Sequence, residues 1–158
     1  MLQSQSIITF DKKFTKKLRI AIVRTNYYVD LVNNLESYAR RTLVTAGVHE
    51  KKIKTFTAPG SWEVPLLVKK VAASKKFDAI IAFGVIVKGE TYHFDMIATE
   101  TASALMQMQL DYNTPVALEI LAVADIKHAQ TRANQDENNK GIEAANAALL
   151  TLQSLQNI

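Results

Sequence analysis

Residues 79–95 carry the strongest structural signal in the chain, and they read Ala79-Ile80-Ile81-Ala82-Phe83-Gly84-Val85-Ile86-Val87-Lys88-Gly89-Glu90-Thr91-Tyr92-His93-Phe94-Asp95. The apolar run from Ala79 to Phe83 indicates a strand that is buried on both faces. Gly84 and Gly89 bracket a predicted turn, and a helix with a threonine and a histidine in its first turns follows. This order is typical of an α/β protein that binds an anionic ligand at the carboxyl edge of a parallel sheet.

The separation of Gly84 and Gly89 also matches the nucleotide-binding P-loop. That motif places a lysine directly after the second glycine, because the lysine must reach the β- and γ-phosphates of the nucleotide. Glu90 stands at this position and would repel them. The segment therefore argues against an NTPase and leaves a smaller phosphorylated ligand open.

Size and composition indicate one soluble domain. With 158 residues, the chain can bury about 68–70% of its unfolded surface without a disulfide or a metal. It contains no Cys, which excludes a disulfide scaffold and thiolate metal sites and suits a reducing compartment. The apolar stretches are shorter than the ~20 residues that span a membrane, and the first residues lack the order of a signal peptide. We therefore expect a cytoplasmic protein without membrane contact.

The net charge of +4 invites a comparison with nucleic-acid-binding proteins. The basic residues are scattered as doublets, and no predicted helix carries a basic stripe interleaved with exposed aromatic residues, as single-strand binders do. We therefore favour solvated surface charge that attracts small anions over nucleic-acid binding.

Apolar, β-branched runs alternate with stretches of helical spacing along the chain. The predicted strands cover residues 18–23, 53–57, 79–83 and 115–123. The predicted helices cover residues 31–43, 61–72, 91–111, 126–132 and 140–155, with Gly47 closing the first helix and Ser61 capping the second. Right-handed crossovers then predict a three-layer α/β/α sandwich around a four-stranded parallel sheet, of the flavodoxin-like kind.

The first 17 residues do not fit this alternation. We therefore divide the chain into an N-terminal arm, residues 1–17, and a single domain, residues 18–158. The stretch Ile7-Ile8-Thr9-Phe10 can form a short strand that adds to the sheet of a neighbouring subunit, and a disordered tail is equally compatible with the pattern.

Polar and aromatic residues follow every predicted strand. Because the carboxyl ends of parallel strands meet at one edge of a sheet, we expect these residues to converge there. Taken singly, each has a simpler explanation: a rim aromatic, a plain turn, a structural histidine or a solvated helix end. Together they supply a flat aromatic ring, a carboxylate, an imidazole and two cations, which suits a planar heterocycle beside an anionic group.

Three motifs at this edge match a known family. They are Ala58-Pro59-Gly60-Ser61-Trp62-Glu63-Val64-Pro65, Gly89-Glu90-Thr91-Tyr92-His93-Phe94-Asp95, and residues 132–141, which end in Asn139-Lys140-Gly141. Because these three motifs occur in this order and at this spacing, the chain resembles lumazine synthase over nearly its whole length.

The resemblance implies a transferase of riboflavin biosynthesis. Such an enzyme condenses 5-amino-6-(D-ribitylamino)uracil with 3,4-dihydroxy-2-butanone 4-phosphate to 6,7-dimethyl-8-ribityllumazine. Phosphate and water are released, and no cofactor or metal is needed. The alternative is a non-catalytic protein that binds a flavin or a ribityl compound on the same scaffold.

The resemblance also implies roles for individual residues. Those of the pyrimidine and ribityl site are Tyr27, Ser61, Trp62, Glu63, Val85, Ile86, Val87 and Leu118, with the ring of Tyr27 stacking on the pyrimidine. Those of the phosphate site are Gly89, Glu90, Thr91, Arg132 and Lys140. His93 matches the general acid/base, and a reference pKa of about 6.5 suits proton transfer near neutral pH.

Two features depart from the family pattern. Leu118 stands where many members place an aromatic residue that reaches the site of a neighbouring subunit. The loop 132–140 lacks the glycines of relatives that assemble into shells. Family members form pentamers with active sites between subunits, and some form 60-subunit shells. We expect a homo-pentamer, with the shell as the alternative.

Overall fold

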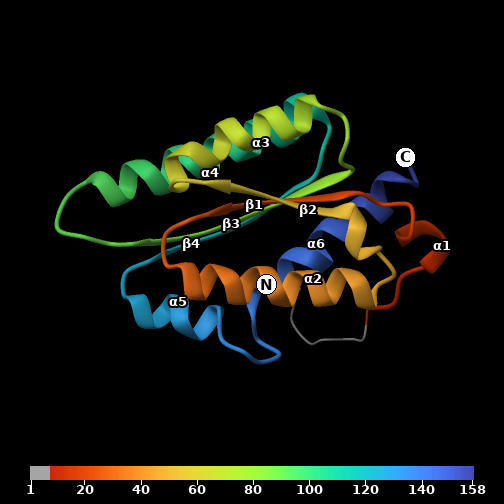
Figure 1. Ribbon diagram of the computed structural model, residues 1–158. Coiled ribbons are helices and arrows are strands. Elements are labelled where there is room, and N and C mark those ends of the chain that lie inside the picture. The colour runs from red at the N-terminus through yellow and green to blue at the C-terminus, as the bar shows by residue number, and fades with distance from the viewer. Residues whose placement is uncertain (1–7) are drawn as a thin grey trace.

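The structure is a computed structural model that describes residues 8–158, and it is a three-layer α/β/α sandwich (Figure 1). Its strands are β1 (Ile20–Thr25), β2 (Ile53–Ala58), β3 (Ala79–Val87) and β4 (Val116–Val123). They pair in parallel in the order β2-β1-β3-β4. This arrangement confirms the predicted four-stranded parallel sheet of the flavodoxin-like kind.

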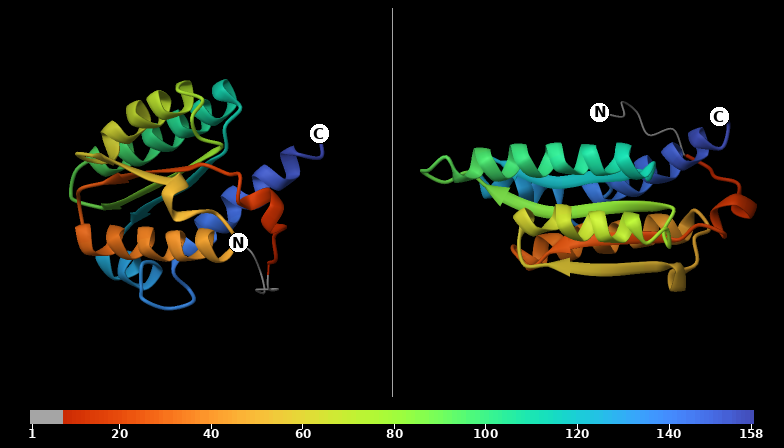
Figure 2. Two further views of the ribbon diagram at one scale, coloured as in Figure 1. Left: turned by 45° about the vertical axis from the view of Figure 1, so that its right-hand side comes forward. Right: turned by 90° about the horizontal axis from the view of Figure 1, so that it is seen from above.

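Helices cover both faces of the sheet. On one face lie α3 (Val64–Ala73) and α4 (His93–Tyr112); on the other lie α2 (Val29–Thr45), α5 (Ile126–Arg132) and α6 (Lys140–Leu155) (Figures 1 and 2). The short helix α1 (Lys12–Thr15) precedes β1, and the 3₁₀ turns η1 (Glu50–Lys52) and η2 (Ser61–Glu63) flank β2. None of the helices described within residues 8–158 combines the length and hydropathy needed to cross a bilayer.

The central strands β1 and β3 are apolar at most positions because each one faces a helical layer on both sides. In β1, Ile20 and Ile22 pack with α2 and α6, whereas Ala21 and Val23 pack with α3 and α4. All four side chains are fully buried. A strand covered on both faces has no solvent side for polar residues, which explains the absence of polar alternation in the sequence.

The amino end of α6 touches α2 closely. The side chain of Asn139 caps α6 by accepting the N–H of Gly141 at 2.8 Å. A Cβ atom built on Gly141 would lie 2.0 Å from the carbonyl oxygen of Leu35 in α2. Only glycine permits this approach, and the contact holds Lys140, the first residue of α6, at a defined place beside the sheet.

Several local boundaries differ from the sequence prediction. Gly84 does not begin a turn, because β3 continues to Val87 and stays paired with β4 along this stretch. Ser61 does not cap a helix; it begins η2, and α3 starts at Val64. The next helix, α4, starts at His93 rather than at position 91. Gly47, with a φ of +109°, closes α2 as predicted.

Part of the predicted N-terminal arm packs on the domain. Phe10 and Phe14 contact the core between the sheet, α2 and α6, and the buried Thr15 donates to the carbonyl of Ala46 at 2.7 Å. Residues 8–10 have no regular secondary structure, and Ile7 of the predicted strand lies outside the described residues. Its pairing with another subunit and the division after residue 17 stay predictions.

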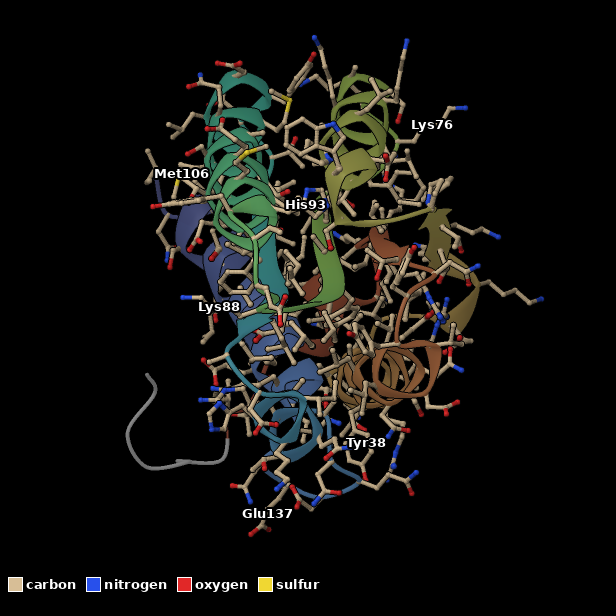
Figure 3. All side chains as sticks on the ribbon, turned by 90° about the vertical axis from the view of Figure 1, so that its left-hand side faces the viewer. Tyr38, Lys76, Lys88, His93, Met106 and Glu137 are labelled. Carbon is tan, nitrogen blue, oxygen red and sulfur yellow. The ribbon has the colours of Figure 1, made fainter. Side chains whose placement is uncertain are left out.

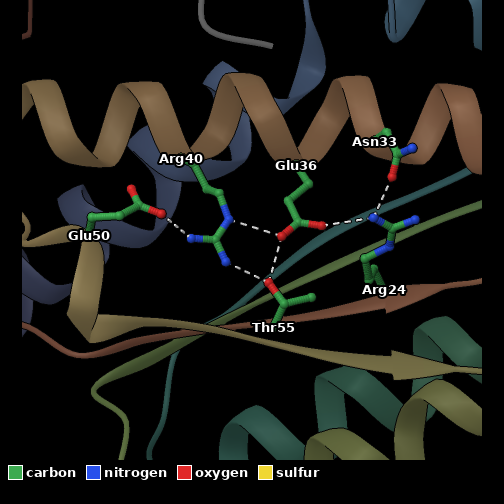
Figure 4. A network of polar contacts seen from close by, with 6 residues as sticks. All are labelled: Arg24, Asn33, Glu36, Arg40, Glu50 and Thr55. Carbon is green, nitrogen blue, oxygen red and sulfur yellow. Dashed lines mark hydrogen bonds and ion pairs between the residues drawn. The ribbon is translucent and has the colours of Figure 1, made fainter.

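A polar network holds α2 against β1 and β2 (Figure 4). Glu36 accepts hydrogen bonds from Arg24 at 3.0 Å, from Arg40 at 3.0 Å and from the hydroxyl of Thr55. Burial raises the pKa of Glu36, but the hydrogen bonds from Thr55, Arg40 and Arg24 outweigh it and leave the pKa below its ordinary value. The ionised carboxylate therefore stabilises the folded state.

We expect Glu36→Gln to lower the free energy of unfolding by roughly 2–3 kcal/mol at pH 7, because Arg24 loses its carboxylate partner and Arg40 keeps only Glu50. A carboxyl group with a lowered folded-state pKa stabilises the protein above its unfolded pKa, and this stabilisation is lost as the pH falls through the folded-state pKa. The difference between parent and variant should shrink below the ordinary pKa of 4.5. Urea unfolding at neutral and acidic pH measures this difference in the free energy of unfolding. The control is Glu100→Gln, which changes an exposed carboxylate on α4. An equal difference at both pH values would contradict the assignment.

Candidate functional site

All four strands end at one edge of the sheet, which faces the viewer in Figure 3. The connections that follow β1, β2 and β3 carry half of the predicted site residues. The connection between β3 and α4 projects beyond this edge (Figures 1 and 2). The parallel sheet therefore places these segments, distant in sequence, on one side of the molecule.

Tyr27 and Glu63 both border Gly60. A Cβ atom built on Gly60 would lie 3.2 Å from Oε2 of Glu63 and 4.0 Å from two carbons of the Tyr27 ring. The amide of Asn26 donates to the carbonyl of Ala58 at 3.0 Å, which ties the ends of β1 and β2 together. The structure thus brings the predicted aromatic ring and the predicted carboxylate to the same place.

Ser61 lies directly against β3 at Gly84. A Cβ atom on Gly84 would lie 3.1 Å from Oγ of Ser61 and 3.0 Å from Cγ2 of Thr25, both tighter than ordinary contacts. The hydroxyl of Thr101 in α4 donates to the carbonyl of Ser61 at 3.3 Å. Gly84 therefore permits a junction of β1, β3, η2 and α4 that holds Ser61 and its neighbour Trp62 at the edge.

Residues 85–87 form the end of β3. Val85 is buried, and Val87 packs against the same core of α2 and α6, whereas Ile86 is half-buried. Beyond the strand, the amide of Lys88 donates to the carbonyl of Val123 at 2.9 Å. Contact of these three residues with a ligand stays a prediction, and the side chain of Val85 is buried in the core.

The predicted phosphate cradle is open to solvent. Gly89, Glu90, Thr91 and His93 are all exposed. His93 is the first residue of α4, and Tyr92 at the N-cap makes no side-chain capping bond. The first N–H groups of a helix lack intrahelical partners and carry positive potential. The start of α4 can therefore accept an anion next to an imidazole.

The remaining predicted residues belong to β4, the edge strand, and to the helices behind it. Leu118 on β4 is 46% exposed. Arg132 ends α5; its guanidinium donates to the carbonyl of His128 at 3.1 Å, and it forms no ion pair within residues 8–158. Lys140 begins α6 and is ion-paired with Glu143. Within the same residues, no hydrogen bond or ion pair joins Leu118, Arg132 or Lys140 to the other predicted site residues.

Glu119 on β4 is a candidate that the sequence analysis missed. Burial raises the pKa of Glu119 to about 7; the nearby Glu143 adds to the rise, and Lys140 and Arg132 oppose it. Its sequence signal is a lone carboxylate within the apolar run 116–123. Its relation to the two cations becomes visible only when α5 and α6 are folded against β4.

A single chain does not enclose the predicted site. Tyr27 is 66% exposed and Trp62 is 56% exposed. A hollow of about 570 Å³ does occur, but it runs along α2 and none of the predicted site residues lines it. No cluster of three or more His, Asp or Glu side chains suited to a metal ion gathers within residues 8–158. The exposed rings are typical of a surface that a ligand or a further protein surface covers.

These features define a flavodoxin-like α/β protein with an open candidate site at the carboxyl edge of its sheet. The model of the family described as 6,7-dimethyl-8-ribityllumazine synthase matches residues 17–156. The chain therefore belongs to the 6,7-dimethyl-8-ribityllumazine synthase family, which confirms the resemblance noted from its motifs.

Proteins of that name in several bacteria are similar to this chain. One from Polaromonas sp. is 40% identical over 88% of each chain, and one from Acidovorax sp. is 36% identical over 89% of each chain. One from Stenotrophomonas maltophilia is 33% identical over 94% of this chain and 96% of the relative. The similarity thus covers the whole sandwich rather than a single motif.

We expect Gly84→Ala to lower the free energy of unfolding by about 1–3 kcal/mol, because the added methyl group must displace Thr25 or Ser61. Gly89→Ala is the matched control, since a Cβ atom there has no other atom within 4 Å, and we expect it to change stability by less than about 0.5 kcal/mol. Urea unfolding at one fixed protein concentration compares the two. Equal losses would show that the junction at Gly84 is not a tight contact.

Proposed function

We propose that this protein is a lumazine synthase that condenses 5-amino-6-(D-ribitylamino)uracil with 3,4-dihydroxy-2-butanone 4-phosphate. The products are 6,7-dimethyl-8-ribityllumazine, phosphate and water. The observation that carries the proposal is membership of the family over residues 17–156, together with the gathering of Tyr27, Ser61 and Glu63 around Gly60 and Gly84. No observation favours the non-catalytic alternative. The cytoplasmic location is part of the proposal.

The pyrimidine substrate would lie on the face of Tyr27. The exposed ring offers a flat apolar surface for stacking. The carboxylate of Glu63, beside the same ring, would accept hydrogen bonds from ribityl hydroxyls. Ser61 and Trp62 of η2 would line this part of the site, and backbone groups of residues 85–87 would meet the edge of the pyrimidine.

The phosphorylated substrate would bind at the start of α4. The backbone of residues 89–91 and the first N–H groups of α4 would hold the dianion through unsatisfied donors and the helix dipole. Backbone binding also explains how Glu90 can belong to the cradle despite its charge. Arg132 would add a planar fork of donors, and its guanidinium has no carboxylate partner within residues 8–158 that would compete for it.

The complete site would lie between two subunits of a pentamer. Leu118, Arg132 and Lys140 of one subunit would face Tyr27 and His93 of its neighbour. Three observations support this arrangement: the open aromatic rings, the exposed Leu118 on the edge strand, and the lack of bonds between the two groups of residues within one chain. A 60-subunit shell built from such pentamers remains the alternative.

His93 would transfer protons during the reaction. Formation of an imine between an amine of the uracil and the ketone, elimination of phosphate and closure of the second ring each move protons to or from nitrogen, oxygen or carbon. An exposed imidazole at the start of α4 lies beside the proposed phosphate cradle. Histidine is a common general acid and base in catalysis.

Mixing the protein with both substrates and following the absorbance of the lumazine tests the proposed function. We expect steady product formation without an added cofactor or metal. A tightly held yellow ligand without product formation would instead establish the non-catalytic alternative.

We expect His93→Ala to slow turnover by about 10²–10⁴-fold and to leave measurable activity, because substrate positioning contributes separately. His49→Ala, which removes another exposed imidazole just before η1, should retain the parent rate. Rates are measured across pH 6–8 with both substrates in excess. Identical profiles for His93→Ala and the parent would exclude the proton-transfer role.

A further inference from the structure

Glu119 is a carboxylate in an otherwise apolar row of β4. Along this strand Ala117 and Leu121 pack with the core of α2 and α6, whereas Ile120 packs with the core of α3 and α4. Because side chains alternate along a strand, Glu119 shares the face of Ala117 and Leu121. Its carboxyl group therefore points into the layer of α5 and α6.

The surroundings of Glu119 favour its neutral form. It is half-buried, and its carboxyl group forms no hydrogen bond with another described residue. Its neighbour on β3 is Phe83, which is fully buried. A carboxylate that is shielded from water without a donor is costly. Burial, and after it the charge of Glu143, accordingly raise the pKa of Glu119 to about 7.

Three charged groups act on Glu119 from the elements packed against it. Arg132 comes from α5, and Lys140 and Glu143 come from α6. Lys140 is already ion-paired with Glu143, and Arg132 has no carboxylate partner within residues 8–158. Arg132 and Lys140 are also the two cations of the proposed phosphate site. An ionised Glu119 and a bound phosphate would therefore be attracted by the same two cations.

We propose that Glu119 is a positioning residue of the phosphate site that takes up a proton when the phosphorylated substrate binds. The role rests on the proposed function, because the ligand is the phosphate that Arg132 and Lys140 would hold. The proton comes from solvent, binds a carboxylate oxygen and leaves again with the phosphate. Protonation removes a negative charge that would repel the dianion and compete for both cations.

Proton uptake has a defined sign in the binding data. A site that binds a proton together with its ligand loses affinity as the pH rises above the pKa of the free protein, by up to tenfold per pH unit. For Glu119, whose pKa is about 7, the loss should begin near neutral pH. Sulfate is a suitable probe, because it stays doubly charged in this range and its own titration adds nothing to the slope.

The experiment measures sulfate binding to the assembled protein by calorimetry between pH 6 and pH 9, in buffers of different ionisation enthalpy. For the parent we expect net proton uptake above neutral pH and an affinity that falls several-fold towards pH 9. Glu119→Gln should bind sulfate with a flatter pH dependence and less proton uptake. Glu100→Gln, an exposed carboxylate on α4, is the matched control and should behave as the parent does.

A second variant guards against a folding defect. Glu119→Leu also removes the carboxyl group, and its side chain suits the apolar row of β4. If Glu119→Gln fails to assemble, we expect Glu119→Leu to show the same flatter pH dependence of sulfate affinity. Proton uptake that is equal in the parent and in either assembled variant would overturn the proposal. Absence of sulfate binding by the parent would overturn it as well.

The role of Glu119 can fail separately from the proposed function. In turnover assays, the KM for the phosphorylated substrate should rise between pH 7 and pH 9 in the parent and rise less in Glu119→Gln. Lumazine formation with the same pH profile of KM in both proteins would refute the role of Glu119 alone. A parent that forms no lumazine would refute the proposed function.

Discussion

The tight contact at Gly84 is the constraint on which the candidate site depends. Because Gly84 has no side chain, η2 can pack with Ser61 directly against β3, beside Thr25. A hydrogen bond from Thr101 of α4 to the carbonyl of Ser61 holds it there. A larger residue would separate the turn from the sheet. Because η2 also carries Glu63, the same contact determines where the carboxylate lies relative to the ring of Tyr27. Backbone packing thus places side chains that come from two separate connections.

Much of the fold follows from the sequence because one physical rule governs it. Strands covered on both faces read as nearly continuous apolar runs, so the apolar, β-branched runs indicate a covered parallel sheet, and β1 and β3 at its centre follow this rule. The helix boundaries at Lys140 and Leu155 also agree with the structure. The failures have tertiary causes. Gly84 suggests a turn locally, but pairing with β4 extends the strand through it. The need for glycine at position 141 comes from Leu35, more than a hundred residues away in sequence.

The site was less accessible to sequence reasoning than the fold. Motifs and family resemblance supplied the residues of the proposed site, and the structure gathers Tyr27, Ser61 and Glu63 as the topology requires. The motifs do not reveal that, within residues 8–158, no hydrogen bond or ion pair joins Leu118, Arg132 or Lys140 to this group. These three residues belong to the edge strand β4 and to the helices that follow it. Likewise, Glu119 is visible as a charge in an apolar run, but its coupling to Arg132 and Lys140 depends on how α5 and α6 pack.

The most direct test of this account is an experimental structure of the assembled protein with a phosphorylated substrate analogue and a ribityl pyrimidine bound. The account predicts that Tyr27 and His93 of one subunit and Arg132 of the adjacent subunit contact the same pair of ligands. An Arg132 guanidinium that faces another surface in the assembly would contradict it. So would a ligand pair held entirely by one subunit.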